Sequence, residues 1–133
     1  YNLNIFIGNQ LAKNGDYNTA LKYYNKVILN NPKNAFAYLN IGTTNKKMGN
    51  YILAVNNYNK AIEIKTDDDY FYLKRGVAKR LNQDFYGAIE DFNKAINLNQ
   101  NRSYYYNNRS IAKENVGDLK GAINDLRKAY LIK

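Results

Sequence analysis

Apolar and small side chains in this sequence recur with a period of 34 residues. The positions that keep this spacing include Gly8, Gly42 and Gly76; Ala20, Ala54, Ala88 and Ala122; and Tyr24, Tyr58, Phe92 and Leu126. An internal repeat of this length is typical of a solenoid, in which similar supersecondary units stack and share a core. We therefore predict a single all-α domain of four repeats, over residues 1–34, 35–68, 69–102 and 103–133.

Each repeat is predicted to form two helices, over repeat positions 2–14 and 17–31. The turn pairs that separate them include Gly15-Asp16, Gly49-Asn50 and Gly117-Asp118. Glycine can adopt the left-handed conformation that ends a helix, and Asp or Asn can cap the helix that follows. Gln83 takes the glycine position in repeat 3, so we expect strain of about 1 kcal/mol at that turn.

The repeat also matches a known pattern, carried by Ala20, Tyr24 and Pro32 in repeat 1, by Tyr38, Ile41, Gly42, Ala54, Tyr58 and Ala61 in repeat 2, and by Tyr72, Gly76, Ala88, Phe92 and Ala95 in repeat 3. Through these residues the whole chain resembles the tetratricopeptide repeat family. The resemblance implies a right-handed superhelix, an α-solenoid of four helix-turn-helix repeats whose first helices line a concave groove. It also implies a module for protein–protein interaction.

Charged residues appear together in repeats 3 and 4. Arg75 and Arg109 stand where the first two repeats have isoleucine, and Asp91 and Asp125 follow each of them after sixteen residues. We predict a salt bridge between the two helices of each of these repeats. Lys79 and Lys113 occur in the same two repeats and either join these networks or point to water. The alternative interpretation of the arginines is a basic ligand site.

The composition argues against catalysis. The chain has no cysteine and no histidine, which removes the usual zinc ligands, thiolate chemistry and the commonest general base. The run Asp67-Asp68-Asp69 precedes a predicted helix, where carboxylates cap the helix and complement its dipole rather than bind a metal. We therefore expect no enzyme, no catalytic or metal-binding residues and no cofactor. No apolar run is long enough to span a bilayer.

The net charge of +9 favours acidic partners. Lysines recur along the second helices and could follow a phosphate backbone; they are Lys26, Lys60, Lys94 and Lys128. The same lysine is common in the repeat family, where it is merely solvated, so nucleic acid is disfavoured as a partner.

The expected binding site lies on the concave face of the first helices, where aromatic, amide and cationic side chains share the inward positions. The predicted ligand-binding residues are Asn9, Lys13, Phe36, Asn40, Lys46, Lys47, Tyr70, Lys74, Arg80, Tyr104 and Asn108. Such a mixture suits an extended peptide that is acidic, apolar or both. The alternative for Phe36, Tyr70 and Tyr104 is packing against the preceding repeat.

Some family members hold the C-terminal carboxylate of chaperones with five side chains. The resemblance places the two asparagines of that clamp at Asn9 and Asn40 and its last cation at Lys74. Its two other lysine positions hold Ile5 and Tyr70. Chaperone tails are therefore disfavoured, whereas another acidic or C-terminal peptide stays a candidate.

A structural role is the second class of function. Repeat arrays normally end in a polar capping helix, and none follows repeat 4. Ile123, Leu126 and Tyr130 are then expected to face solvent. We expect either a piece of a longer array or self-association through uncapped ends.

Overall fold

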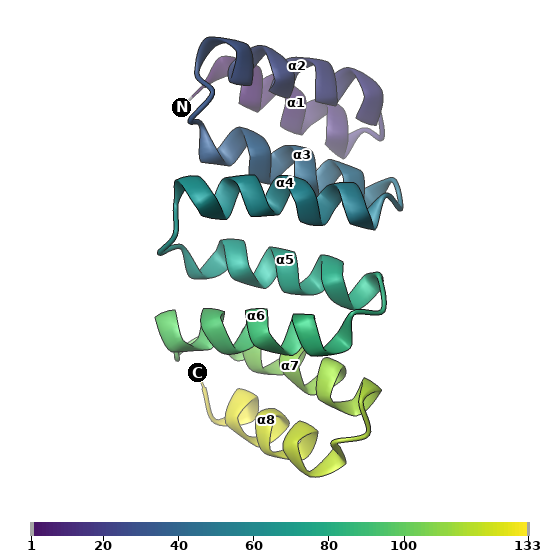
Figure 1. The fold of residues 1–133 in the computed structure, drawn as a ribbon, viewed down its shortest axis with the longest axis vertical. Helices are drawn as coiled ribbons and strands as arrows, with labels where there is room; N and C mark the ends of the chain where they lie inside the picture. The colour runs from purple at the N-terminus through teal and green to yellow at the C-terminus, as the bar shows by residue number, and fades with distance from the viewer. Residues whose placement is uncertain (1, 133) are drawn as a thin grey trace. The chain divides into compact units, whose positions relative to one another are not determined.

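The computed structural model describes residues 2–132, and every regular element in that range is an α-helix (Figure 1). The helices are α1 (Leu3–Lys13), α2 (Tyr17–Asn30), α3 (Ala35–Lys47), α4 (Tyr51–Ile64), α5 (Asp69–Leu81), α6 (Phe85–Leu98), α7 (Ser103–Asn115) and α8 (Leu119–Leu131). The prediction of two helices per repeat is confirmed, with small differences at the helix ends. The fold is an all-α helical repeat.

Packing divides the chain into two compact units. Unit 1 is Tyr1–Thr66 and holds α1 to α4, and unit 2 is Asp67–Lys133 and holds α5 to α8. Each unit contains two helical hairpins, α1–α2 and α3–α4 in unit 1 and α5–α6 and α7–α8 in unit 2. Within each unit the second helix of the first hairpin packs on the first helix of the next, α2 on α3 and α6 on α7.

The turn inside each hairpin needs a left-handed residue. Gly15, Gly49 and Gly117 have φ angles of 84°, 83° and 83°, which glycine adopts without steric cost. Gln83 occupies the equivalent position with φ at 66°. The expected strain at this turn is therefore present, because a side chain disfavours the left-handed region.

Aspartate side chains cap three of the second helices. Asp16, Asp84 and Asp118 accept backbone N–H groups in the first turns of α2, α6 and α8. Asn50, at the same place before α4, makes no side-chain capping bond. The capping prediction is thus confirmed for the aspartates and wrong for the side chain of Asn50.

The two helices of a hairpin approach closely where glycine faces an aromatic ring. A Cβ atom added to Gly42 would lie 2.6 Å from Cε1 of Tyr58, and one added to Gly76 would lie 2.6 Å from Cε1 of Phe92. These distances are far below van der Waals contact, so only glycine fits. Repeat 4 carries Ser110 at this position, and there the opposing residue is the smaller Leu126.

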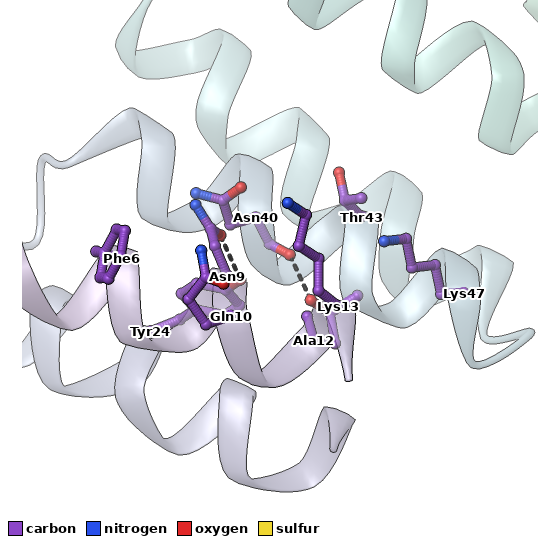
Figure 2. Close-up of a pocket in the computed structure, with 10 residues that line it drawn as sticks. Phe6, Asn9, Gln10, Ala12, Lys13, Tyr24, Asn40, Thr43 and Lys47 are labelled. Carbon is purple, nitrogen blue, oxygen red and sulfur yellow. Dashed lines mark hydrogen bonds between the residues drawn. The ribbon is translucent and has the colours of Figure 1, made fainter. Parts of the chain in front are cut away.

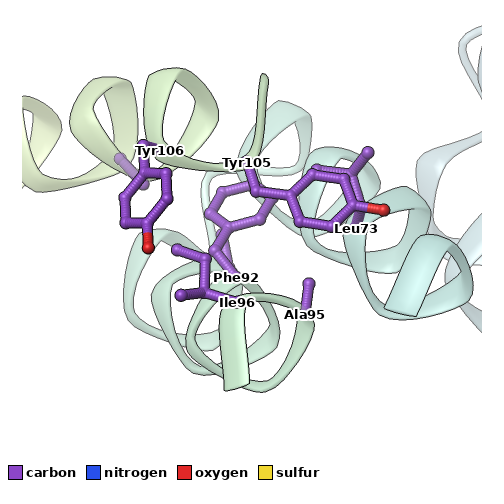
Figure 3. Packing of buried hydrophobic residues seen from close by; sticks show 8 residues of the cluster. Leu73, Phe92, Ala95, Ile96, Tyr105 and Tyr106 are labelled. Atoms are coloured by element: carbon purple, nitrogen blue, oxygen red, sulfur yellow. The ribbon is translucent and has the colours of Figure 1, made fainter. Parts of the chain in front are cut away.

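A core cluster of unit 2 joins its two hairpins (Figure 3). Phe92 and Ile96 of α6 pack with Tyr105 and Tyr106 of α7, and Leu73 of α5 joins them. In unit 1 smaller clusters connect α2 to α3 through Tyr24 with Ile41 and Val27 with Ala37. The interface between consecutive hairpins is therefore apolar in both units.

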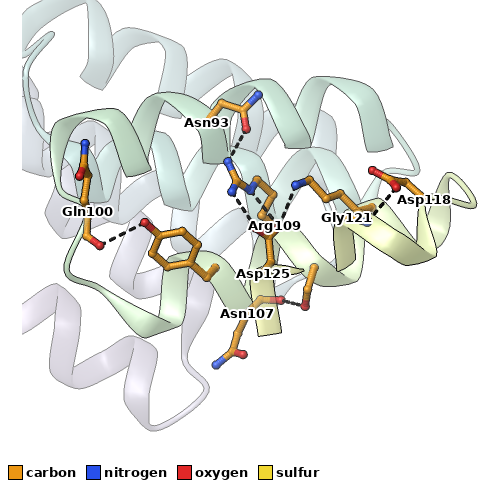
Figure 4. Close-up of polar contacts among 10 residues, drawn as sticks. Asn93, Gln100, Asn107, Arg109, Asp118, Gly121 and Asp125 are labelled. Carbon is orange, nitrogen blue, oxygen red and sulfur yellow. Dashed lines mark hydrogen bonds and ion pairs between the residues drawn. The ribbon is translucent and has the colours of Figure 1, made fainter. Parts of the chain in front are cut away.

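The predicted salt bridges are confirmed. Arg75 donates to both carboxylate oxygens of Asp91 at 2.9 and 2.8 Å, and Arg109 donates to those of Asp125 at 2.9 and 2.7 Å. This geometry is the bidentate one that makes guanidinium–carboxylate bonds strong. The charged pairs connect α5 to α6 and α7 to α8, as expected, and Figure 4 shows the pair between α7 and α8.

Lys79 and Lys113 join these networks rather than point to water. Their ammonium groups lie 3.2 Å from Asp91 and 3.1 Å from Asp125. Burial alone raises the pKa of Asp125, but the hydrogen bonds and charges of Arg109 and Lys113 outweigh it and hold that pKa below its usual value. The hydrogen bond to Asp91 raises the pKa of Arg75.

The aspartate run before α5 has a structural role in this fold. Asp68 accepts the backbone N–H of Tyr70 as the N-cap, and Asp69 accepts the hydroxyl of Tyr105 at 2.6 Å. Burial and this hydrogen bond raise the pKa of Tyr105. Within residues 2–132 no group of three acidic, histidine or cysteine side chains is arranged to hold a metal ion. None of the helices described is long and apolar enough to cross a membrane.

Candidate functional site

A pocket lies between α1 and α3 in unit 1. Its volume is about 340 Å³, and its lining consists of Phe6, Asn9, Gln10, Ala12, Lys13, Tyr24, Asn40, Thr43, Thr44 and Lys47 (Figure 2). Four of the predicted binding residues, Asn9, Lys13, Asn40 and Lys47, are thus brought together. The other lining residues were not in the predicted set.

The side chain of Asn9 is oriented by a hydrogen bond from a core residue of its own hairpin. The hydroxyl of Tyr24 donates to Oδ1 of Asn9 at 2.6 Å. Tyr24 is buried and lies on α2, with its ring against Gly8 of α1. Because the amide oxygen is held by this bond, the amide nitrogen is turned towards Asn40, as Figure 2 shows.

Repeat 2 builds its part of the pocket in the same way. The hydroxyl groups of Thr43 and Tyr58 lie 2.9 Å apart, and Thr43 is one repeat after Asn9, as Tyr58 is after Tyr24. The buried Thr44 hydroxyl donates to the backbone oxygen of Asn40 at 2.8 Å. Two polar residues of the lining, Asn9 and Thr43, are therefore oriented by buried tyrosines, and Thr44 is oriented by the backbone of its own helix.

The charge of the pocket is positive. Lys13 and Lys47 are exposed and line it, and no carboxylate is among the lining residues. In the sequence from residue 1 to residue 66 the acidic residues are Asp16 and Glu63 alone, against eight lysines. An anionic group entering the pocket would therefore meet amide donors and two ammonium groups in a positive field.

The remaining predicted residues of unit 1 lie outside this lining. Phe36 is half-exposed near the start of α3, and Lys46 is half-buried in its last turn. The structure therefore divides the predicted set of unit 1 into four pocket residues and two neighbours on the same helix.

The predicted residues of unit 2 lie on α5 and α7. The ammonium group of Lys74 lies 5.7 Å from the centroid of the Tyr70 ring, within the range of a cation–π contact. Burial, and after it the neighbouring Tyr104, raises the pKa of Tyr70. Arg80 is half-buried in the last turn of α5, and its Nε atom has no hydrogen-bond partner among the described residues.

Asn108 does not fit the predicted role. It is 6% exposed, and its amide nitrogen donates to the backbone oxygen of Tyr104 at 2.8 Å. An asparagine can satisfy itself on the preceding helical turn in this way and so pack inside. Ile5, Leu39 and Leu73, on the first helices of the other three hairpins, are buried core residues as well.

The aromatic residues at the second position of repeats 2, 3 and 4 are about half exposed. Phe36, Tyr70 and Tyr104 are 50%, 46% and 58% exposed. They are not buried core residues, and the packing of their covered halves against the preceding repeat stays a prediction. Their rings are accessible to a ligand.

The pocket residues that the sequence analysis missed are chiefly Gln10, Thr43 and Tyr24. A signal for two of them is present in the repeat. Repeat positions 9 and 24 change together, as Asn9 with Tyr24 and Thr43 with Tyr58, whereas unit 2 has Val77 with Phe92 and Ile111 with Leu126. A hydroxyl on the core residue thus accompanies a polar surface residue.

The lysines along the second helices contact tyrosine rings. Lys60, Lys94 and Lys128 lie 5.7, 5.9 and 5.8 Å from the rings of Tyr38, Tyr72 and Tyr106. Lys26, whose repeat has Asn4 instead of that tyrosine, lies 4.5 Å from the Tyr23 ring. Each lysine of this set therefore has a partner inside its own repeat.

Comparison with known proteins agrees with this architecture. The family model of the tetratricopeptide repeat matches residues 1–34, 37–68 and 70–102 but not the fourth repeat. No curated protein matches the sequence. A crystal structure of MamA is 26% identical, with a TM-score of 0.88 over 96% of this chain and 74% of that one. MamA from residue 41 to its end, from Desulfovibrio magneticus RS-1, is 23% identical, with a TM-score of 0.89 over 97% of this chain and 73% of that one.

Proteins built from these repeats generally act as protein–protein interaction modules rather than as enzymes. The family match covers most of the sequence, and the hairpins show the glycine, alanine and aromatic packing expected of it. This chain belongs to the tetratricopeptide repeat family.

Proposed function

We propose that this protein binds an acidic segment of a partner protein in the pocket between α1 and α3. The observation that carries the proposal is the lining itself, which combines Asn9, Asn40, Lys13 and Lys47 with no carboxylate. Amide nitrogens donate to carboxylate or backbone oxygens, and ammonium groups attract the acid from a distance.

The pocket is also prepared for binding before a ligand arrives. The amide of Asn9 is held by Tyr24 and the hydroxyl of Thr43 by Tyr58, at 2.6 and 2.9 Å. A binding surface that is already ordered loses little conformational entropy when the ligand binds. Its volume of about 340 Å³ is enough for one or two side chains of an extended peptide.

Exposed rings next to the pocket would add apolar contacts. Phe6 stands at one end of the lining, and Phe36 lies on α3 with half of its surface exposed. The favoured ligand is therefore a peptide in which acidic and apolar residues are mixed.

The test compares two variants of equal charge. In Lys13→Glu/Lys47→Glu the substitutions lie in the pocket, and in Lys22→Glu/Lys33→Glu they lie on exposed positions outside its lining. The probes are fluorescein-labelled peptides of mixed acidic and apolar sequence and their neutral Asn/Gln counterparts, followed by anisotropy.

We expect the acidic peptides to bind wild type and the control variant, and the pocket variant to lose at least about tenfold in affinity, which corresponds to about 1.4 kcal/mol. Affinity for wild type should fall as salt rises. An equal loss in both variants would assign binding to diffuse charge instead of the pocket. Absence of any preference for acidic over neutral peptides would contradict the proposal.

A further inference from the structure

The pocket between α1 and α3 differs in chemistry from one end to the other. Phe6, which is 49% exposed, lies at one end of the lining (Figure 2). Lys13 and Lys47 line the other end, where they are exposed in the last turns of α1 and α3. An apolar group and an anionic group of a ligand would therefore be held at opposite ends of the pocket.

The distance between the two ends follows from helix geometry. Phe6 and Lys13 are seven residues apart on α1. At about 1.5 Å per residue their Cα atoms are separated by about 10 Å, and two turns of helix bring both side chains to the same face. Lys47 occupies the repeat position of Lys13 on the neighbouring helix, so the two cations stand at the same end.

The polar groups between the two ends suit the backbone of an extended segment. Asn9 and Asn40 each bring an amide to the lining, and the hydroxyl of Tyr24 orients that of Asn9 at 2.6 Å. A polyproline-type segment has no internal hydrogen bonds, so its N–H and C=O groups are open to amide side chains. A helical ligand, whose backbone groups are already bonded to one another, would leave these amides unused.

The length of the pocket then selects a spacing in the ligand. In a polyproline-type segment residues i and i+3 point to the same side and are about 9 Å apart, which matches the separation of about 10 Å between the pocket ends. Neighbouring residues point to different sides and lie too close together to reach both ends.

We infer that the pocket recognises a spaced pair of side chains in one extended segment. An acidic side chain is held by Lys13 and Lys47, and a large apolar side chain three positions away packs against the ring of Phe6. The inference rests on the proposed function and adds a rule for the sequence of its ligand. It makes Phe6 a specificity-determining residue, since the ring distinguishes among ligands of equal charge.

Peptides of identical composition test the spacing rule. Each has one leucine and one glutamate in a background of proline and serine, and acetylated and amidated ends leave the glutamate as its only charge. The two residues stand one, three or seven positions apart, in both orders along the chain, because the lining does not fix the direction of the ligand. Titrations followed by two-dimensional ¹H–¹⁵N NMR spectra measure the weak affinities expected for a single acid.

We expect the peptide with a separation of three, in at least one of the two orders, to bind at least about fivefold tighter than the peptides with other separations, because only it makes both contacts at once. Phe6→Ala should remove this preference while the affinity for the other peptides stays the same. The matched control is Leu29→Ala, an exposed position on α2 outside the lining, which should keep the preference. The NMR spectra also show that each variant keeps its fold.

The outcomes separate this inference from the proposed function. Equal affinity at every separation, with a loss of binding in Lys13→Glu/Lys47→Glu, overturns the spacing rule and leaves acidic-peptide binding intact. Tightest binding at a separation of seven overturns it as well, because seven residues span about 10 Å in a helix and the ligand would then be helical. So does a preference for three that survives Phe6→Ala. If glutamate and glutamine versions bind alike, or neither binds, the proposed function fails together with the inference.

Discussion

The first helices of unit 1 carry isoleucine, Ile7 and Ile41, where those of unit 2 carry Arg75 and Arg109. The facing residues on the second helices differ in the same way, with Tyr23 and Asn57 in unit 1 and Asp91 and Asp125 in unit 2. Both units nevertheless form two hairpins with the same helix lengths to within a few residues. The repeat geometry is therefore set by its glycine, alanine and aromatic positions, and this second layer of contacts can be apolar or ionic.

At another position of the first helices the difference is reversed, with polar residues in unit 1 and apolar residues in unit 2. In unit 1, Asn9 and Thr43 bond to buried tyrosine hydroxyls and line a polar pocket. In unit 2 the same positions hold Val77 and Ile111, above Phe92 and Leu126. Unit 1 thus places its polar groups at the surface and unit 2 places charge inside its hairpins.

The largest expected difference in stability comes from removing the aspartate of an ionic network. Asp125→Ala leaves Arg109 and Lys113 without their counter-charge in a largely buried site, so we expect a loss of about 3–5 kcal/mol in the free energy of unfolding. The matched change in unit 1, Asn57→Ala, removes one bond to the backbone oxygen of Leu53 and should cost about 1 kcal/mol or less. Urea unfolding followed by circular dichroism measures both.

The networks can also be replaced instead of broken. Arg109→Ile/Lys113→Asn/Asp125→Asn gives repeat 4 the residues that repeat 2 has at these positions. If the ionic layer is interchangeable with the apolar one, this variant should be far more stable than Asp125→Ala. A triple variant as unstable as the single one would contradict that interpretation.

The next largest expected difference is in the pH at which each unit unfolds in acid. Since the pKa of Asp125 is lower in the folded chain than in the unfolded one, its contribution to stability is complete above the unfolded value of about 3.9 and is lost as the pH falls through the folded value. We expect amide signals of residues 67–132 to disappear from NMR spectra at a higher pH than those of residues 2–66. The triple variant is the control, and it should move the transition of unit 2 to lower pH.

A smaller effect on stability should follow from exchanging tyrosine and phenylalanine at the core position of the second helices that faces the first helices. Phe92→Tyr places a hydroxyl opposite Val77, where it has no polar partner on that side chain, and should cost about 1–3 kcal/mol. Tyr58→Phe removes the bond to Thr43 without burying a new polar group, and should cost about 1 kcal/mol. Phe92→Tyr/Val77→Thr rebuilds the pair of repeat 2, and recovery of stability in urea unfolding would support the coupling of these positions.

The smallest change concerns the turns. Gln83→Gly relieves a left-handed residue at φ 66° but adds freedom to the unfolded chain, so a gain of about 0.5 kcal/mol is expected. Gly49→Gln, the reverse change in unit 1, should cost about 1 kcal/mol. The shift in thermal midpoint measures both, and a loss on Gln83→Gly would mean that the glutamine side chain makes a compensating contact.

The sequence predicted the helices and the ionic networks because both depend on spacing. Glycine and aspartate mark each turn, and arginine and aspartate sixteen residues apart face each other across a hairpin. The lining of the pocket was predicted less completely. Asn40 and Asn108 occupy the same repeat position, yet one lines a pocket and the other is buried against the backbone oxygen of Tyr104. An amide can satisfy itself in either way, so only the surrounding packing decides.

The bonds from Tyr24 to Asn9 and from Tyr58 to Thr43 also bear on how such repeats can be recombined. In a chimera that grafts α1 onto a second helix with phenylalanine in place of Tyr24, Asn9 would lose the group that orients it. Shuffling at the level of single helices would therefore scramble the recognition surface even where the hairpin still packs. The smallest piece that can be transplanted with its specificity intact is the complete hairpin, cut at the turns between repeats.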